Sequence, residues 1–531
     1  MKRIYITLGI LLTGVIAMAY LYFSNLNTET NANDLSLNTV ASNSGIIFSF
    51  ENDKSFYEIL SGQDLFQHIL GETKSKQFAA LRDHLMSQQE IVNALNGQKI
   101  YIGLIPGSEN TIDFLIGTQL NSNTNSQKLF NSLNTGQTKV NKVGEIYQLT
   151  FTDSTKCFIG IKNTMIVLSN ILLPIQNALK AQKTEKQDFV NYIKNNSRFN
   201  KNTLASLYLD FNQMPLFLKS ILNSNLNGEL SIFNKQNTYA ALSYNFSKEK
   251  LLFNGNTQVN DEHNYYKLFD HISEQKITIN TILPQKTANY TIYAISDYDN
   301  WHKNLLELMT KNKEIDKVNQ TIATINQKYR IDLDQILPKY FKNELVTFQL
   351  SSGEKFAAIA LSNGEKVAQL LMDLSGNYAP EIKVFKEAGI AYAYFGEPFK
   401  KFERPFYAVV NNYLVMANNA SSIQVFLNSY ENNSLLISDE DYQDFSNQLS
   451  SSATISFYVN HKNSNDIFGR NLKQPYFKQY QAKAGFKSFD AFSYQLSGDK
   501  GKFLSNVLLY KKLEKITPKD TLSVQAIPIN K

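Results

Sequence analysis

The chain has 531 residues, of which 43% are hydrophobic and 12% aromatic, and its formal net charge is +6 at pH 7. A chain of this length is too long for one small core, so we expect two domains or two large lobes. The basic residues form no stripe, which argues against nucleic-acid binding. The single cysteine, Cys157, excludes an intramolecular disulfide and a cysteine-rich zinc site. Its apolar neighbours predict a buried core residue.

An apolar run follows two basic residues at the N-terminus. Lys2 and Arg3 precede an uncharged stretch over residues 4–23. A helix of that length spans about 30 Å, the thickness of the hydrocarbon core of a bilayer. The run is either a cleaved signal peptide or a retained signal anchor, and the aromatic residues at its outer end favour the anchor. The positions predicted to anchor the chain in the membrane are Ile4, Leu8, Leu11, Leu12, Val15, Ile16, Tyr20 and Phe23.

The basic residues before the run are expected to stay in the cytoplasm, so the bulk of the chain faces the periplasm or the exterior. The protein is then a single-pass protein of the inner (cytoplasmic) membrane, or it is secreted to the periplasm if the leader is cleaved. Residues 24–44 are rich in Asn, Ser and Thr without periodicity, which predicts a flexible linker. A flexible tail is predicted at residues 514–531.

From residue 45 onwards, strand and helix patterns recur in the same order in the two halves of the chain. Each half opens with a strand-like run, at residues 46–50 and 290–295, followed by a helix-start signal. Apolar residues three and four apart between Ile315 and Tyr329 predict a helix with one apolar face. In the first half the similar stripe is Phe78, Leu81 and Leu85.

Hairpins with glycine in the turn are predicted at residues 100–116 and 346–361. Further matched pairs are expected along the chain, each by its pattern of apolar residues. These are a helix at 126–133 with one at 365–374, a strand at 146–151 with one at 390–395, and a strand at 157–161 with one at 406–410.

The closest matches come later in each half. Residues 163–168 and 412–417 both begin with Asn and continue as an apolar strand, and a helix follows in each half through Ile175 or Ile423. The remaining matches are Asp188 with Asp441, residues 207–209 with 457–459, and the closing hairpins that contain Ser243-Tyr244 and Ser493-Tyr494.

These matches predict one structural unit that was duplicated and diverged. We expect an α+β fold of two tandem repeated lobes after an N-terminal transmembrane helix. Each lobe should be a mainly antiparallel sheet with helices packed on one face. The predicted domains are the anchor at residues 1–23, the linker at 24–44, the first lobe at 45–260, a connector at 261–287, the second lobe at 288–513 and the tail at 514–531.

The order of elements resembles an uncharacterised bacterial envelope family, the domain-of-unknown-function family numbered 3352. The resemblance rests on the apolar anchor, on the strand and helix at residues 412–427, and on the segment from Asp441 to Tyr458. It implies a membrane anchor followed by a large extracytoplasmic region. It implies no catalytic residues, because the family carries no catalytic pattern.

Motifs for catalysis, cofactors and metals are not found in the sequence. The nearest metal-like cluster combines residues 261–263 with Asp270 and His271. In a helix its two histidines would lie about 12 Å apart along the axis, too far for one metal ion. The acidic pairs at 332 and 334 and at 440 and 441 are typical of helix starts. We therefore predict no catalytic, cofactor-binding or metal-binding residue.

The residues that coincide between the halves are mainly apolar and aromatic, so the duplication preserved a core. This favours a non-enzymatic binding or scaffolding protein whose partner is an envelope protein, a lipid or a cell-wall polymer. Tyr244 and Tyr494 are candidate exposed aromatics, and core positions are the alternative. Two other functions stay open: an extracytoplasmic hydrolase with a site assembled from distant residues, and a lipid-binding envelope protein.

Overall fold

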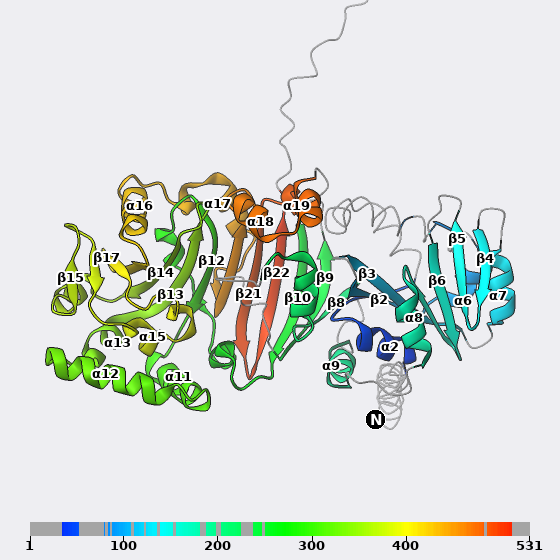
Figure 1. Ribbon diagram of the computed structural model, residues 1–531, viewed down its shortest axis with the longest axis horizontal. Helices are drawn as coiled ribbons and strands as arrows, with labels where there is room; N and C mark the ends of the chain where they lie inside the picture. Colours follow the sequence, from blue (N-terminus) through cyan, green and yellow to red (C-terminus); the bar gives the residue numbers. More distant parts are fainter. Residues whose placement is uncertain are drawn as a thin grey trace, which may run out of the picture. The chain divides into compact units, whose positions relative to one another are not determined.

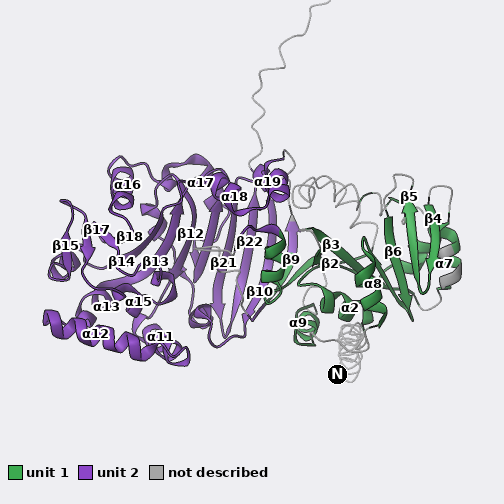
Figure 2. Ribbon diagram, viewed as in Figure 1, with its two compact units in different colours: residues 1–60, 77–220, 239–243 green, residues 61–76, 221–238, 244–531 purple. Residues whose placement is uncertain are grey.

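The fold is a mixed α+β arrangement dominated by antiparallel β-sheet (Figure 1). The chain divides into two compact units (Figure 2): unit 1 comprises residues 1–60, 77–220 and 239–243, and unit 2 comprises residues 61–76, 221–238 and 244–531. The computed structural model describes residues 34–52, 79, 83–84, 88–107, 111–121, 124–134, 138–151, 156–180, 187–197, 203–224, 237–246, 250–482 and 486–511. The predicted anchor, the predicted tail and the stripe of Phe78, Leu81 and Leu85 lie outside these residues.

The sheet of unit 1 runs in the order β4-β5-β6-β7-β3-β2-β1-β8-β9, and all of these pairings are antiparallel. The strands are β1 (Ile46–Glu51), β2 (Lys99–Pro106), β3 (Ile112–Gln119), β4 (Thr138–Val143), β5 (Ile146–Phe151), β6 (Lys156–Lys162), β7 (Met165–Ser169), β8 (Ser206–Asp210) and β9 (Thr238–Phe246). The helices are α2 (Leu35–Asn43), α6 (Gln89–Leu95), α7 (Ser126–Leu133), α8 (Leu172–Lys180), α9 (Gln187–Ser197) and α10 (Met214–Ile221).

Helix α2 occupies residues that the sequence assigned to the flexible linker, so that prediction is wrong for residues 35–43. Asp34 begins the helix by accepting a hydrogen bond from the backbone N of Leu37 at 3.0 Å. Leu37 and Val40 are buried in the core of unit 1. A Cβ at Gly117 would lie 2.7 Å from the Val40 side chain, so the glycine allows the helix to pack close to the sheet. The polar composition concealed this short apolar face.

The sheet of unit 2 runs in the order β10-β22-β21-β20-β12-β13-β14-β18-β17-β16-β15, again with antiparallel pairings, and β11 and β19 form a small second sheet. The strands are β10 (Lys250–Val259), β11 (Gln275–Lys276), β12 (Thr287–Ala294), β13 (Phe341–Leu350), β14 (Lys355–Leu361), β15 (Ser375–Asn377), β16 (Lys383–Phe385), β17 (Phe406–Val410), β18 (Tyr413–Ala417), β19 (Ser452–Ala453), β20 (Ile455–Asn460), β21 (Ala491–Asp499) and β22 (Lys502–Tyr510).

The α-helices of unit 2 are α11 (Tyr298–Lys311), α12 (Ile315–Tyr329), α13 (Leu337–Tyr340), α14 (Gly364–Leu370), α15 (Ile390–Phe395), α16 (Ala420–Glu431), α17 (Glu440–Ser446), α18 (Asn465–Asn471) and α19 (Gln474–Gln481). The 3-10 helices are η3 (Tyr265–Phe269), η4 (Ile279–Ile282), η5 (Leu333–Gln335), η6 (Glu397–Phe399), η7 (Leu436–Ser438) and η8 (Phe486–Ser488). The helix predicted between Ile315 and Tyr329 is confirmed with these bounds.

Helices cover both faces of the unit 2 sheet, whereas the sequence predicted helices on one face only. Helices α11, α12 and α15 pack on one face, and α16 and α17 pack on the other (Figure 1). The central strand β12 is buried along its whole length. Tyr293 belongs to the first core, and Tyr290 and Ile292 belong to the second. The described residues of unit 1 also form cores on both faces of its sheet, one with Leu115 and one with Phe114. Apolar residues on both faces of a strand require cover on both sides.

Residues 390–395 form helix α15, so the strand predicted there is wrong. Strand β16 pairs with β17 in its place. Gly389 and Gly396 flank the helix with φ of +78° and +72°, and most of the residues between them are buried. Both values lie in the left-handed region that glycine adopts readily. A run of six apolar residues does not separate a strand from a buried helix by periodicity.

The two units share one order of strand pairing. In unit 1 the pairing order is β4-β5-β6-β7-β3-β2-β1-β8-β9. In unit 2 the strands β15-β16-β17-β18-β14-β13-β12-β20-β21 pair in the same order, position by position. The hairpins β6–β7 and β17–β18 both have a two-residue turn that begins with an asparagine in the left-handed region, Asn163 at φ +56° and Asn411 at φ +50°. By its place in the turn Asn163 matches Asn411, whereas the sequence pattern paired it with Asn412. Such a shift exchanges the faces of a strand.

Candidate functional site

The predicted membrane anchor cannot be placed, because its eight positions between Ile4 and Phe23 lie outside the described residues. In the described part of the chain, no helix combines the length and the apolar character that a membrane span requires.

Tyr244 and Tyr494 are core residues and not exposed aromatics. Their exposed fractions are 3% and 5%. The ring of Tyr244 lies 5.3 Å from that of Phe253, and the Tyr494 hydroxyl is 2.6 Å from the Thr257 hydroxyl. Burial raises the pKa of Tyr494 to about 12. Of the two interpretations made from the sequence, the core position is the correct one.

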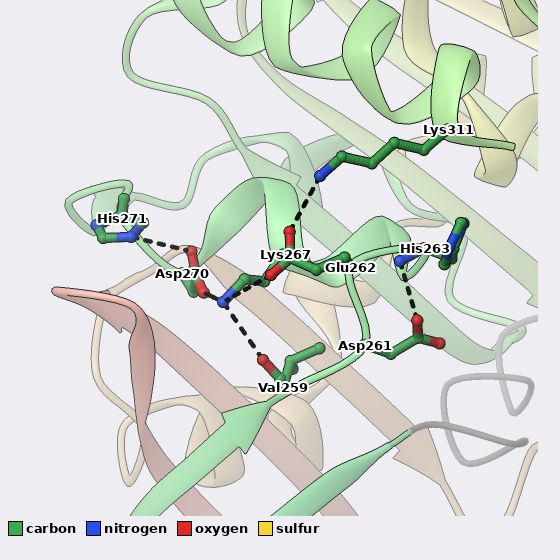
Figure 3. Close-up of polar contacts among 8 residues, drawn as sticks. All are labelled: Val259, Asp261, Glu262, His263, Lys267, Asp270, His271 and Lys311. Carbon is green, nitrogen blue, oxygen red and sulfur yellow. Dashed lines mark hydrogen bonds and ion pairs between the residues drawn. The ribbon is translucent and has the colours of Figure 1, made fainter.

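The acidic residues Glu262 and Asp270 of the predicted connector form ion pairs with lysines, and Lys267 contacts both of them (Figure 3). The His263 Nδ1 lies 2.7 Å from the Asn312 side-chain oxygen. The buried Asp270 forms an ion pair with Lys267 at 2.8 Å, while His271 is exposed. Across all described residues, no three His, Cys, Asp or Glu side chains gather closely enough to hold a metal ion. The helix η3 beside these contacts is part of the unit 2 core, so the contacts hold the connector on that unit.

Strand β13 begins with a bulge. Phe341 and Leu345 pair with Leu361 and Ile359, so three residues of β13 lie opposite one residue of β14. Bulges redirect side chains and are frequent beside functional sites. The bulge residues are Lys342, Asn343 and Glu344.

A hollow of about 350 Å³ lies beside this bulge. Its volume is near the lower end of the range of about 300–1,000 Å³ for small-molecule sites. We call this cavity the bulge hollow, and among the described residues Lys342 is the one charged side chain that lines it. The other lining residues are Thr278, Ala360, Leu361, Ser362, Asn411, Asn412 and Tyr413.

Glu344 holds one wall of the bulge hollow in position. Its carboxylate is fully buried and accepts two hydrogen bonds from Thr278, one from the backbone N at 2.8 Å and one from the hydroxyl at 2.5 Å. A buried carboxylate is stable only when donors replace the lost water. Glu344 thereby ties the segment before η4 to β13.

The turn between β17 and β18 forms another wall. The Asn411 side-chain amide donates to the Tyr430 hydroxyl at 2.7 Å. The Asn412 side-chain oxygen accepts from the backbone N of Gly364 at 2.9 Å. Among the described residues, the Asn412 amide nitrogen and the Lys342 ammonium have no hydrogen-bond partner. These two donors are therefore available to a ligand.

The lining offers recognition groups and no catalytic pair. Ser362 is a lining hydroxyl, and it donates to the Tyr340 carbonyl oxygen at 3.2 Å. Among the described residues that line the hollow, there is no histidine, aspartate or glutamate to act as a base for this hydroxyl. The arrangement can bind a small polar molecule.

Sequence reasoning did not find the bulge hollow. It noted Asn412 as the start of a strand, but it assigned no role to Lys342 or Glu344. A bulge leaves no periodic signal, because the extra residues are defined only by the partner strand.

Comparison of the chain with protein-family models, curated proteins and solved structures found no match.

Proposed function

We propose that the protein is a membrane-tethered, extracytoplasmic binding or scaffolding protein without catalytic activity, built from two tandem copies of one α+β unit. The observation that carries the binding role is the bulge hollow, which is lined by hydrogen-bonding groups without a nucleophile and base. The apolar run at residues 4–23 after Lys2 and Arg3 supports the membrane tether.

Equivalent core positions support the duplication. Ile175 in α8 and Ile423 in α16 follow the corresponding strands β7 and β18, and both are fully buried. Tyr208 in β8 and Tyr458 in β20 are buried as well, each in the core on the same face as that isoleucine. A copied unit preserves its packing because a change of core volume costs stability.

Pairing within unit 2 between segments that a duplication would make equivalent supports it further. Strands β10 and β22 pair antiparallel with Asn254 opposite Asn506. Leu222, directly after α10, forms a β-bridge with Leu472, directly after α18. Asn223 N donates to Asn471 O at 2.8 Å, and Lys473 N donates to Ile221 O at 2.8 Å.

Cysteine labelling in spheroplasts tests the location. Native Cys157 is buried, so the unmodified chain should react little with a membrane-impermeant maleimide and serves as the control. The variant Lys303→Cys places a thiol on an exposed position of α11. We expect this variant to be labelled in intact spheroplasts. Labelling only after lysis would refute the extracytoplasmic location.

Membrane fractionation tests the tether. We expect the full chain to remain in the membrane pellet after alkaline carbonate washing. Deletion of residues 4–23 should move it to the soluble fraction. A full chain that is soluble from the start would contradict the tether and favour a cleaved leader.

A further inference from the structure

The polar groups of the bulge hollow match a molecule rich in hydroxyl groups. Asn412 keeps a free amide nitrogen, while the Asn411 amide donates to Tyr430 and leaves its side-chain oxygen able to accept. The Ser362 hydroxyl donates to a backbone carbonyl and can still accept. The side chains of Asn411, Asn412 and Ser362 together thus offer both hydrogen-bond donors and acceptors, which match the hydroxyl groups of a sugar. An isolated anion would need donors alone.

The apolar surface of the bulge hollow comes from Tyr413, whose side chain is half-buried. Ala360 and Leu361 also line the hollow at the end of β14, but they are only 3% and 1% exposed. A pyranose ring has C–H groups on its faces and hydroxyls on its rim, so it can contact an apolar wall and amides together. A hollow with apolar surface on one side and amides on another suits one such ring.

The charge of the hollow is positive. Lys342 is exposed and has no carboxylate partner in the described part of the chain. Glu344, two residues further on, is fully buried and bound to Thr278. The ammonium group is therefore free to form an ion pair with a ligand, which a neutral sugar would not use.

We propose that the bulge hollow binds one pyranose unit of a glycan that carries a carboxylate. The carboxylate pairs with Lys342, the hydroxyls bind Asn411 and Asn412, and the ring lies against Tyr413. This assignment deepens the proposed binding function and rests on it, because it names the ligand class of the same site.

Titration of the full chain in detergent with three probes tests the ligand class. N-acetylmuramic acid has the ring and a carboxylate, N-acetylglucosamine has the ring alone, and sodium lactate has the carboxylate alone. Isothermal titration calorimetry should show that N-acetylmuramic acid binds at least about tenfold more tightly than either other probe. Only this probe can place a ring against Tyr413 and a carboxylate against Lys342 at the same time. Equal affinity for lactate would overturn the sugar assignment, and equal affinity for N-acetylglucosamine would overturn the role of the charge.

Two variants locate the binding. Lys342→Gln should weaken N-acetylmuramic acid binding about tenfold and leave N-acetylglucosamine unchanged. Lys303→Gln, at an exposed lysine of α11 that does not line the hollow, is the matched control. Asn411→Gly keeps the left-handed turn, removes the amide and should weaken both sugars about fivefold. Far-ultraviolet circular dichroism should match the unmodified chain for all three variants.

The result for the ligand is separable from that for the proposed function. If the full chain does not bind N-acetylmuramic acid, or binds it equally well with Lys342→Gln, the ligand assignment fails while the labelling of Lys303→Cys still reports the location. If labelling places the chain in the cytoplasm while the sugar binds, the proposed location fails and the site stands.

Discussion

Lys99 in β2 and Glu344 in β13 occupy the same place in the strand pairing of the two units and differ in chemistry. Lys99 pairs with Glu51 at the end of the β1–β2 register, and Glu344 pairs with Ala294 at the end of the β12–β13 register. Lys99 is exposed, whereas Glu344 is fully buried beside a bulge. The same position in the strand order thus holds an exposed lysine in unit 1 and a buried carboxylate in unit 2. Residues of this bulge lie outside the ladder between β13 and β14, so they can change while that pairing is kept.

A second pair of positions shows the same contrast. Phe211 directly follows β8, and His461 directly follows β20. Both are buried. The His461 Nδ1 is 2.7 Å from the Phe489 carbonyl oxygen. Unit 2 therefore has a titratable group where unit 1 has a purely apolar ring, and it should respond to acid differently.

The largest expected effect tests whether the core around Ile175 in unit 1 and the core around Ile423 in unit 2 are equivalent. Ile175→Ala and Ile423→Ala should each lower the free energy of unfolding by about 2–5 kcal/mol, because each leaves a cavity at a fully buried position. Urea unfolding measures both. Trp301, the one tryptophan, is buried in unit 2, so its fluorescence follows that unit, and circular dichroism follows the whole chain. A loss below about 1 kcal/mol for only one variant would break the equivalence.

Acid sensitivity of unit 2 is the next largest effect. Burial lowers the pKa of His461 to about 4, below its ordinary value of about 6.5. Below about pH 6.5 the unfolded chain binds a proton there, while the folded imidazole stays neutral down to about pH 4. Stability should therefore fall as the pH drops through this window, by about 3 kcal/mol in total, and stay lost at lower pH.

His461→Phe gives unit 2 the residue of unit 1 and should remove this part of the pH dependence. Urea unfolding at pH 7, pH 5 and pH 4, followed by Trp301 fluorescence, compares the variant with the unmodified chain. Parallel loss of stability in both proteins would show that His461 is not the titrating group.

A smaller effect is expected at the buried carboxylate. Glu344→Gln replaces one acceptor of the Thr278 hydrogen bonds by an amide NH₂, so the free energy of unfolding should fall by about 1–3 kcal/mol. Lys99→Gln, at the corresponding exposed position, is the control and should change it by less than about 0.5 kcal/mol. Equal effects at the two positions would mean that the bulge adds no buried polar contact.

The smallest effect concerns the two matched turns. Asn163→Ala and Asn411→Ala should each cost about 1–2 kcal/mol, because alanine is strained in the left-handed region that both asparagines adopt. Asn163→Gly should be neutral within about 0.5 kcal/mol, since glycine adopts this conformation readily. Thermal unfolding by calorimetry resolves these differences. A tolerated alanine at one site only would show that the turns are not equivalent.

Patterns that repeat along the chain were predictable from the sequence. The three- and four-residue spacing of α12 and the apolar run of β18 identified both elements, because periodicity follows from the geometry of one helix or strand. Helix α2 was missed, since two of its five buried residues, Ser36 and Thr39, are polar and weaken the apolar pattern. Helix α15 was taken for a strand because its short apolar run has no distinguishing period.

The sequence by itself determined the mixed α+β class, the antiparallel hairpins and most of the strands, because these depend on local periodicity and turn residues. Only the tertiary structure decided which strands pair, that helices cover both faces of the sheet, and that Lys342, Asn412 and Thr278 line one hollow. Those residues are far apart in the chain. The pairing of β14 with both β13 and β18, together with the hydrogen bonds from Thr278 to Glu344, brings them together. Register depends on long-range packing, which no local stretch of residues encodes.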